Sequence, residues 1–509
     1  MRDVLARRVS AVVIGCLIAG SLAAGGVATT GLEPAAAASA TKLPGWLHTS
    51  GSSIKTAKNT TYVVKAVAWF GMETTNCAPH GLWSISVNQG LEQIRSMGFN
   101  TVRLPFSNEC IAASSTNSID AAKNPKLVGK TPLQVMDYIV KRAKAYGLNI
   151  ILDRHRPDSN AQSALWYTDQ YSEARWISDW KKLAKRYKKS SNVIGFDLHN
   201  EPHGDACWGC GDRATDWQAA ATRAGNAVLK VNPKLLIIVE GVERQSTGTA
   251  NTWWGGGLAG VAKKPVKLTV KNRVVYSPHD YPSSIYSQPW FSAANYPKNL
   301  PAQWDTDWGY IDRKGIAPIL LGEFGTKLET TSDKLWLKTM VSYLKKNGMS
   351  FAYWSFNPNS GDTGGLVKDD WTTKQTTKLK YLKPLLGNGT SVKADTTTTT
   401  PPTTEPTTST SATATWKLQS SWQDGYVTQF DVTAGSSAVS TWSITWADAT
   451  ATGIASSWGM ACTVATGASV TCTGADWGAA IPAGASTSVG VQVTGGAAPA
   501  SPRVSITAR

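Results

Sequence analysis

The sequence predicts an α/β fold, a (β/α)₈ barrel, followed by a small all-β sandwich domain. Between about residue 65 and residue 357, short apolar stretches alternate with amphipathic helical stretches, which is the pattern of a parallel sheet whose strands are joined by helices. Near residue 395 the composition changes to threonine, proline, serine and alanine. After Trp416 short alternating segments rich in valine, threonine, tryptophan and glycine indicate a β-sandwich.

Eight apolar stretches have the length of buried strands, and each ends in polar or aromatic residues. The carboxyl ends of the strands of such a barrel meet at one face, where active sites are built. The expected strands are Ala66–Phe70, Thr101–Phe106, Asn149–His155, Val193–Asn200, Leu235–Gly241, Val274–Tyr281, Pro318–Gly325 and Phe351–Asn357. The side chains expected to gather at the face are Arg103, His155, Asn200, Glu201, Glu240, His279, Tyr281, Glu323 and Trp354.

Helices are predicted between these strands. The first of them opens with Thr131, a favoured N-cap, and Pro132, which suits the first helical position, and it stops at Gly147. The clearest helical stretches are Thr131–Tyr146, Glu173–Lys188, Thr215–Val231 and Ser332–Lys346.

Residues 1–40 have the pattern of a secretory signal peptide. Arginines at positions 2, 7 and 8 precede an apolar run from Val9 to about Ala24, and small residues end at Ala38-Ser39-Ala40. We expect a secreted, extracellular protein that starts near Thr41 and has no membrane contact once the signal is removed. A retained membrane anchor is the alternative. Residues 41–394 would then form the barrel, 395–415 a linker and 416–509 the sandwich.

Six cysteines remain after Cys16 leaves with the signal peptide, and an even number in an exported protein indicates disulfides. Two lie alone beyond the linker and should pair with each other. The close spacing of Cys207 and Cys210 favours a local bridge, which leaves one further pair. The expected disulfides are Cys77–Cys110, Cys207–Cys210 and Cys462–Cys472.

A zinc site is the alternative for one of these pairs. His199 and His203 lie close to Cys207 and Cys210 in the sequence, and these ligand types suit tetrahedral zinc. However, His199 should point along a strand, and exported cysteines are usually oxidised. We therefore expect no metal and no cofactor.

The chain is basic, with 51 lysines and arginines against 35 acidic residues and a net charge of +16. A nucleic-acid partner is one interpretation of such a charge. The basic residues are instead scattered along the predicted helices, as at Lys181-Lys182 and Lys188-Lys189, without a long basic block. Solvated helix faces explain this pattern, and we expect no nucleic-acid partner.

Two strand ends carry carboxylates that can do chemistry together. Glu201 follows one buried strand and Glu323 ends another. Hydrolysis of a glycosidic bond with retention of configuration needs a nucleophilic carboxylate and an acid/base carboxyl group about 5–5.5 Å apart. Either glutamate alone could be half of a structural ion pair, but two at strand ends of one barrel favour catalysis.

Three motifs resemble the family 5 glycoside hydrolases, and the closer match is to actinobacterial endo-β-1,4-glucanases of that family. The likeness covers about Trp46 to Leu386 and also includes His80–Trp83, Asp153–Asp158 and Cys207–Asp212. The three motifs are Asn200-Glu201-Pro202, Leu321-Gly322-Glu323-Phe324-Gly325 and Tyr353-Trp354-Ser355-Phe356-Asn357-Pro358.

The resemblance implies a role for each site residue. Glu323 would be the nucleophile, held by Arg103 and Tyr281, and Glu201 the acid/base beside His279. By the same resemblance, Asn200 would contact the sugar 2-hydroxyl, His155 would line the cleft, and Trp354 would form the floor beneath the sugar before the scissile bond. Sugar-stacking platforms are expected at Trp83, Trp253 and Trp254, although core packing explains such residues equally well.

The C-terminal segment resembles a family 2 carbohydrate-binding module. In that family a row of exposed aromatic residues binds cellulose, and Trp422, Trp458 and Trp477 occupy matching positions here, in three separate predicted loops. Trp442 and Trp446 alternate along a strand and should be core. The family usually joins the two ends of the module by a disulfide, and neither end has a cysteine here.

Together these observations predict a secreted, monomeric, retaining endo-β-1,4-glucanase that acts on cellulose or a related β-glucan. One alternative is the same machinery acting on another β-glycan, such as mannan, xyloglucan or mixed-linkage glucan. The other is a non-catalytic wall-binding protein on a decayed barrel. The intact set of Glu201, Glu323, Arg103, Asn200 and Tyr281 argues against decay.

The module generates a first prediction. Stacking on an aromatic face is worth about 1–3 kcal/mol per ring in nucleic-acid complexes, so Trp458→Ala should weaken binding to crystalline cellulose by roughly 5- to 150-fold. Removal of everything after Asp395 should reduce adsorption to crystalline cellulose and activity on it, and leave turnover of a soluble substrate intact. Cellulose pull-down beside a melting curve tests this; unchanged binding with a lowered melting temperature would show that Trp458 is core.

Overall fold

The structure is a computed structural model that describes residues 43–387, 412–475, 478–499 and 502–508. The chain divides near residue 396 into two compact units, each of which is described by itself. The predicted signal peptide and most of the predicted linker lie outside the described residues. Within the described part of the chain, no helix has the length and apolar character needed to cross a bilayer.

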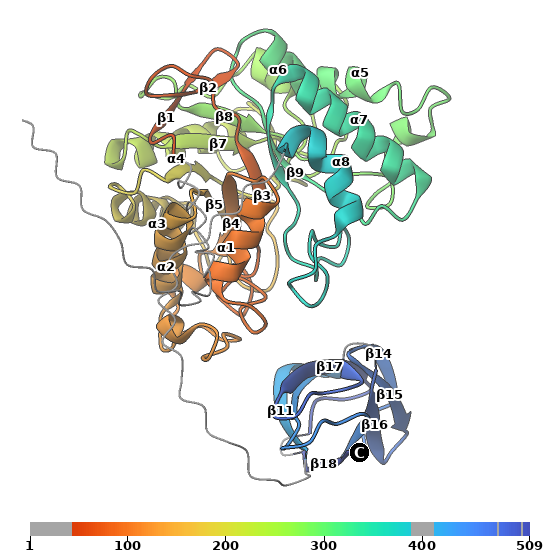
Figure 1. The fold of residues 1–509 in the computed structure, drawn as a ribbon. Helices are drawn as coiled ribbons and strands as arrows, with labels where there is room; N and C mark the ends of the chain where they lie inside the picture. Colours follow the sequence, from red (N-terminus) through yellow and green to blue (C-terminus); the bar gives the residue numbers. More distant parts are fainter. Residues whose placement is uncertain (1–42, 388–411, 476–477, 500–501, 509) are drawn as a thin grey trace, which may run out of the picture. The chain divides into compact units, whose positions relative to one another are not determined.

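The first unit contains an eight-stranded sheet of parallel neighbours, in the order β8-β7-β6-β5-β4-β3-β10-β9. Parallel bridges at Tyr276–Ile319 and His279–Glu323 join β8 to β9 and close the sheet into a barrel. The predicted (β/α)₈ barrel is therefore confirmed (Figure 1). Its strands are β3 (Lys65–Ala68), β4 (Thr101–Ser107), β5 (Asn149–Arg156), β6 (Val193–Asp197), β7 (Leu236–Glu240), β8 (Val274–Ser277), β9 (Leu320–Phe324) and β10 (Ser350–Tyr353).

Helices surround the barrel and cover the outward-facing side chains of the strands (Figure 1). Capping residues fix where they begin: Thr131 accepts a hydrogen bond from the backbone N–H of Gln134, and Asp216 accepts one from Ala219. The helices are α1 (Val87–Ser96), α2 (Pro132–Ala145), α3 (Glu173–Arg186), α4 (Trp217–Val231), α5 (Leu300–Trp304), α6 (Tyr310–Arg313), α7 (Thr331–Asn347) and α8 (Thr376–Leu386).

The interior of the barrel changes character along its axis. Successive side chains of a strand alternate between the two faces, so β5 sends Ile151, Asp153 and His155 to the same side. Ile151 belongs to an apolar cluster inside the barrel, whereas Asp153 and His155 are buried polar residues nearer the carboxyl end. The same change occurs on β7, from Ile238 to Glu240. Apolar packing therefore fills one half of the interior, and ionisable groups gather in the other.

A hairpin that the sequence patterns did not predict closes the apolar half. Strands β1 (Leu47–Ser50) and β2 (Ser53–Thr56) pair antiparallel, and Leu47 and Ile54 are buried in the interior cluster. Because this end is filled, a substrate can reach the ionisable groups only from the carboxyl end of the barrel.

Several predicted strands end earlier than expected. The strand predicted to reach Asn200 ends at Asp197, the one predicted to reach Tyr281 ends at Ser277, and the one predicted to reach Asn357 ends at Tyr353. Glu201 has a φ of 54°, a left-handed conformation that strand geometry cannot contain. The Asn200-Glu201-Pro202 motif therefore lies in the turn after β6 rather than in the strand.

The second unit is a sandwich of two four-stranded sheets, ordered β11-β12-β17-β14 and β15-β16-β13-β18, with antiparallel neighbours, as predicted. Trp442 and Trp446 lie in its core, as expected. The first strand begins at Thr413, inside the segment predicted as linker. The strands are β11 (Thr413–Trp422), β12 (Gly425–Thr433), β13 (Trp442–Ala447), β14 (Gly453–Trp458), β15 (Met460–Ala465), β16 (Ser469–Gly474), β17 (Ser486–Thr494) and β18 (Val504–Ala508).

All three predicted disulfides are present. Cys462 and Cys472 are directly opposite each other on β15 and β16, so their bridge is local to one sheet. The Cys207–Cys210 bridge occupies both sulfur atoms that the zinc alternative would need as thiolates. The third disulfide joins Cys77 to Cys110.

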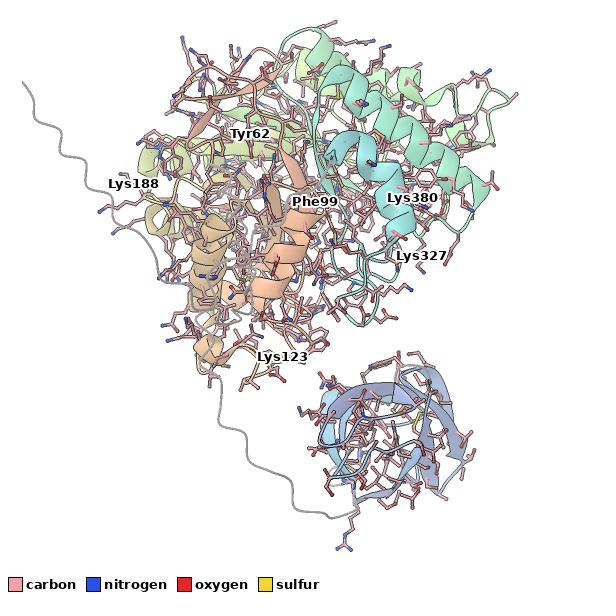
Figure 2. All side chains as sticks on the ribbon, in the orientation of Figure 1. Tyr62, Phe99, Lys123, Lys188, Lys327 and Lys380 are labelled. Atoms are coloured by element: carbon pink, nitrogen blue, oxygen red, sulfur yellow. A yellow bond between two sulfur atoms is a disulfide. The ribbon has the colours of Figure 1, made fainter. Side chains whose placement is uncertain are left out.

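The lysine pairs singled out on the predicted helices lie on the solvated surface, as their spacing predicted. Lys181, Lys182 and Lys189 are exposed. In Figure 2 the labelled Lys188, Lys327 and Lys380 lie at the outside of the first unit. Exposed lysines dispersed over the first unit contribute to the net charge.

The packing of α1 generates a second prediction. Alanine normally stabilises a helix interior relative to glycine by about 1 kcal/mol. At Gly90 a Cβ would lie 2.3 Å from the buried ring of Trp69. Gly90→Ala should therefore lower the melting temperature. Gly225→Ala in α4 is the matched control, because its nearest atoms are single methyl carbons at 2.9 and 3.0 Å, on Leu268 and Ile237, rather than the face of a ring at 2.3 Å. Equal or higher stability of Gly90→Ala would contradict this packing.

Candidate active site

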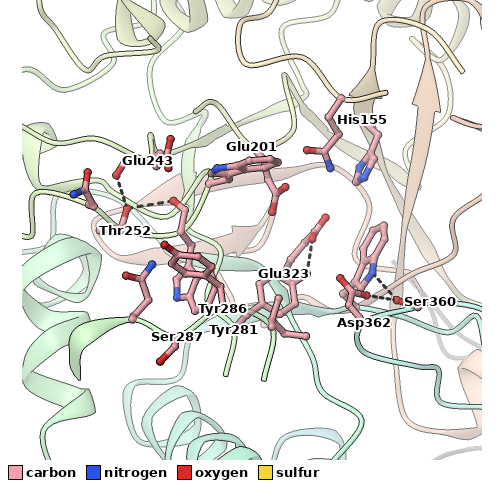
Figure 3. Close-up of a pocket in the computed structure, with 18 of the residues that line it drawn as sticks. His155, Glu201, Glu243, Thr252, Tyr281, Tyr286, Ser287, Glu323, Ser360 and Asp362 are labelled. Atoms are coloured by element: carbon pink, nitrogen blue, oxygen red, sulfur yellow. Dashed lines mark hydrogen bonds between the residues drawn. The ribbon is translucent and has the colours of Figure 1, made fainter. Parts of the chain in front are cut away.

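Glu201 and Glu323 face each other at the carboxyl end of the barrel (Figure 3). A carboxylate oxygen of each lies within 4.8 Å of the other. Inverting glycosidases separate their carboxyl groups by about 6.5–9.5 Å to admit a water molecule, whereas retaining enzymes hold them about 5–5.5 Å apart. The spacing here therefore suits direct attack by one carboxylate on a sugar.

Glu323 is held on both of its oxygens. Arg103 Nη1 donates to Oε1 at 2.5 Å, and the Tyr281 hydroxyl donates to Oε2 at 2.6 Å. Burial, with the nearby charge of Glu323, raises the pKa of Tyr281 well above its usual range, so the phenol stays protonated and donates. Two hydrogen bonds therefore fix the orientation of the Glu323 carboxyl group, from the positions predicted for Arg103 and Tyr281.

Glu201 is held differently. Its backbone N–H donates to Glu240 Oε2 at 2.6 Å, and its Oε1 lies 3.0 Å from His279 Nδ1. Burial alone would lower the pKa of His279, but the carboxylates of Glu240 and Glu323 raise it well above the ordinary histidine value. His279 is therefore a hydrogen-bond donor toward Glu201 at working pH.

Arg103 is the centre of the buried charges. Its side chain is fully buried on β4, where its nitrogens lie 3.0 Å from Asp197, 3.1 Å from Asp153 and 3.1 Å from Glu240, besides the bond to Glu323. One guanidinium cannot neutralise four carboxylates. Burial accordingly raises the pKa of Asp153 and of Asp197 to about 7, against the opposing effect of Arg103.

Asn200 and His155 complete the predicted support. Asn200 Oδ1 accepts from Arg103 Nη2 at 3.0 Å, so its amide nitrogen is turned away from Arg103 and has no partner in the described protein. His155 Nδ1 lies 2.7 Å from Asp153 Oδ2. Burial lowers the pKa of His155 to about 3, so the ring is neutral.

The two glutamates open into a cleft of about 1550 Å³. Trp354 lines it, and its ring is nearly parallel to that of His155 at a centroid distance of 5.2 Å and to that of Phe70 at 5.4 Å. Its indole N–H donates to Ser360, whose hydroxyl donates to Asp362. Figure 3 shows this group on one side of the glutamates. A rigid flat ring beside the glutamates suits the floor predicted from the family resemblance.

The other side of the cleft carries a second aromatic group. Trp254 is 45% exposed and stacks on His203 at 3.8 Å, so one face of its ring is available to a ligand. Trp253 is buried, although it lines the cleft, and it packs edge-on against Tyr281. Tyr286 is 65% exposed and was missed, because nothing in its local sequence marks it as part of the site.

Two other predicted residues have different outcomes. Trp83 packs against Trp371 and is not among the residues that line the cleft, so the platform expected there lacks support. His199, the other member of the zinc alternative, is buried with Nδ1 2.7 Å from Arg154 Nη1. His199 therefore takes part in a structural hydrogen bond with the cationic side chain of Arg154 rather than in a metal site.

The tryptophans of the module can be followed only in part. Trp458 is half-buried at the end of β14, where its ring lies against Gly490 of β17. Trp422 ends β11, so these two lie at strand ends rather than in loops, at edges of one sheet. The side chain of Trp422 and all of Trp477 lie outside the described residues.

Sequence patterns missed part of the charged layer. Glu240 was recognised as a strand-end residue without a role, and Asp153 and Asp197 were not singled out. The available signal was a charged residue at an inward position of a strand that is otherwise apolar, as in Phe196-Asp197-Leu198. Such a position requires a buried partner, and the partner, Arg103, is distant in sequence.

Comparison with known proteins shows which families this chain resembles. A family model described as cellulase (glycosyl hydrolase family 5) matches residues 58–360, and one described as cellulose binding domain matches residues 412–508. An endoglucanase of Paenibacillus polymyxa is 52% identical over 358 residues, which is 69% of this chain and 90% of that protein. The major extracellular endoglucanase of Xanthomonas campestris pv. campestris is 42% identical over 330 residues, 64% of this chain and 68% of that protein.

Solved structures show the same likeness. The catalytic domain of the Xanthomonas campestris pv. campestris enzyme is 40% identical with a TM-score of 0.64, and the match covers 67% of this chain and all of that one. A variant endocellulase of Pyrococcus horikoshii, in complex with cellotetraose, is 39% identical with a TM-score of 0.64, over 68% of this chain and all of that one.

The charged layer generates a third prediction. Asp153 has a pKa of about 7 in the fold and about 3.9 in an unfolded chain. Between these values the folded protein binds more protons, so this group stabilises the fold at low pH and that contribution is lost as pH rises toward 7. Asn cannot titrate. The melting temperature of Asp153→Asn, relative to the unmodified protein, should therefore rise between pH 4 and pH 7 and then level off. A difference that stays constant with pH would contradict the raised pKa.

Proposed function

The chain belongs to the cellulase family of glycosyl hydrolases, family 5, and we propose that it is a secreted, retaining endo-β-1,4-glucanase. The single observation that carries the mechanism is the pair of Glu201 and Glu323, whose oxygens lie within 4.8 Å in an open cleft. The endoglucanase relatives, at 52% and 42% identity, support the activity on internal β-1,4-glucosidic bonds.

In the first step Glu323 attacks the anomeric carbon of the sugar on Trp354. A bond forms between a Glu323 carboxylate oxygen and that carbon, while the bond from the carbon to the glycosidic oxygen breaks. Glu201, protonated, gives its proton to the departing oxygen, and a covalent glycosyl-enzyme remains. Glu201 is then ionised, and its Oε1 accepts from His279 Nδ1.

In the second step the roles of Glu201 reverse. Glu201 takes a proton from an incoming water whose oxygen attacks the anomeric carbon from the side the leaving group vacated. The bond to Glu323 breaks, and its carboxylate returns to the hydrogen bonds from Arg103 and Tyr281. Two displacements at one carbon restore the original β configuration.

The surrounding residues lower the barrier by orientation and charge. The Asn200 amide nitrogen, turned away from Arg103, is free to donate to the sugar 2-hydroxyl, where hydrogen bonds strengthen in the transition state. Trp354 supplies a flat apolar face for the ring. The exposed faces of Trp254 and Tyr286 would hold sugar rings on the other side of the glutamates.

The second domain would hold the enzyme on its insoluble substrate. Its match to a cellulose binding domain supports cellulose or a related β-glucan as the partner. The signal-like first 40 residues and an extracellular relative support a location outside the cell, and we expect a monomer that needs no cofactor. Release of reducing sugar from a panel of pure β-glycans ranks cellulose against mannan, xyloglucan and mixed-linkage glucan.

The two-step scheme generates a fourth prediction. Glu323→Ala should lose at least ~10³-fold in turnover on every substrate, because the covalent step disappears. Glu201→Ala should lose as much on cellotetraose, but its kcat/KM on 2,4-dinitrophenyl β-cellobioside should remain close to that of the unmodified enzyme, because dinitrophenolate leaves without a proton.

Proton NMR of the first product provides the stereochemical control. The unmodified enzyme should release the β-anomer first, which then equilibrates slowly in water. An α-anomer as first product, or equal losses of Glu201→Ala on both substrates, would rule the scheme out.

A further inference from the structure

Glu240 is a fully buried carboxylate that the two steps above do not use. It ends β7, and its two oxygens face different partners. Oε2 accepts the backbone N–H of Glu201 at 2.6 Å. Oε1 lies 3.1 Å from Arg103 Nη2 and 3.2 Å from His279 Nε2. A single side chain therefore contacts Glu201 directly and also the two residues that contact Glu201 and Glu323.

The backbone of Glu201 needs such support. Its φ of 54° is a left-handed conformation that costs free energy in any residue with a Cβ, and such strain persists only where neighbouring contacts hold it. The N–H of this strained residue is the group that Glu240 accepts. The left-handed turn also directs the Glu201 side chain across the cleft, so the Glu240 contact bears on where its carboxylate lies.

Gly255 packs closely against this contact. A Cβ at this position would lie 2.6 Å from Glu240 Oε2 and 3.2 Å from the Glu201 Cα. The backbone of Gly255 also bonds to both sides of the contact, donating to Pro202 at 3.3 Å and accepting from Gly241 at 2.8 Å. Glu240 therefore has no room for another rotamer toward that side.

We propose that Glu240 is the positioning residue of the acid/base: it fixes the left-handed backbone of Glu201 and, through His279, the hydrogen bond that the Glu201 carboxylate accepts. This inference rests on the proposed function, in which Glu201 is the acid/base. The His279 ring lies between the two carboxylates, with Nε2 toward Glu240 and Nδ1 toward Glu201. An anion at Nε2 orients the ring so that Nδ1–H donates to Glu201.

All three partners of Glu240 are donors or cations, which makes the amide substitution informative. Glu240→Gln keeps the size of the side chain. Whichever way the amide is turned, however, its NH₂ group meets either the Glu201 N–H or the Arg103 and His279 nitrogens. The variant can therefore keep only one of the two contacts.

Asp197 offers a matched control. It is equally buried and lies 3.0 Å from Arg103 Nε, but it makes no hydrogen bond or ion pair with Glu201 or His279. Asp197→Asn therefore removes a buried carboxylate from the same arginine without touching the acid/base. Its loss weakens the hold of Arg103 on Glu323, which every substrate needs, and it removes a charge within 4.8 Å of Glu240, but it leaves the contacts of Glu240 with Glu201 and His279 in place.

The experiment compares kcat/KM on cellotetraose, whose leaving group needs a proton, with kcat/KM on 2,4-dinitrophenyl β-cellobioside, whose leaving group does not. General acid catalysis contributes about 10²–10⁴-fold. Glu240→Gln should lose about 10²-fold on cellotetraose and less than about 5-fold on the aryl substrate. In Asp197→Asn, kcat/KM should fall by similar factors on the two substrates. Glu240→Asp keeps the charge but is too short to reach both partners, so it should lose less activity than Glu240→Gln, again more on cellotetraose than on the aryl substrate. It replaces Glu240→Gln if that variant does not fold.

The outcomes separate this inference from the proposed function. Equal losses on the two substrates in the Glu240 variants, with a clear split in Glu201→Ala, would overturn the role of Glu240 and leave the acid/base in place. Absence of the split in Glu201→Ala as well would overturn the proposed function itself. Melting curves recorded for each variant show whether a loss of activity comes from a loss of folded protein. A merely structural role of Glu240 would lower kcat/KM on both substrates together.

Discussion

The buried guanidinium of Arg103 is the interaction on which the active end of the barrel depends. A charge in the interior of a protein is costly unless it is paired and hydrogen-bonded. Asp153, Asp197, Glu240 and Glu323 surround this one, each within 3.1 Å. Because these carboxylates come from four other strands, the ion cluster is also a cross-link that holds the carboxyl ends of the strands at fixed positions.

The cluster carries more negative than positive charge, and this excess shapes the chemistry. Burial raises the pKa of Asp153 and of Asp197 to about 7, and the carboxylates raise the pKa of His279 well above its usual range. The surplus acidity is thus partly neutralised by bound protons rather than by further cations. Glu323 receives the shortest of the Arg103 contacts, at 2.5 Å, together with the Tyr281 hydroxyl. Both oxygens of Glu323 are therefore held by donors although several other carboxyl groups lie nearby.

The remainder of the barrel makes this charged layer possible. The apolar cluster that includes Ile151, Leu236 and Leu320 fills the opposite half of the interior, and the hairpin of β1 and β2 closes it with Leu47 and Ile54. The interior is filled at one end and open at the other, so the ionisable groups meet solvent and substrate only through the cleft. Trp354 on one side and Trp254 and Tyr286 on the other give that cleft flat surfaces suited to a chain of sugars.

Local pattern alone was enough for the barrel, the sandwich, the disulfides and the two glutamates. Alternation of apolar strands and amphipathic helices is typical of an α/β fold with a parallel sheet. The predictions of that fold and of the family are confirmed. Strand ends meet at one face of such a barrel, so Glu201, Glu323 and their predicted partners could be grouped without coordinates. Contacts between distant segments were decided only by the tertiary structure. The layer of Asp153, Asp197 and Glu240 around Arg103 follows from the inward pleat of four strands, and the placement of Trp83 outside the cleft and Tyr286 inside it follows from loop paths. Short-range patterns record which face a residue occupies, whereas its partner across the barrel depends on the closure of the whole sheet.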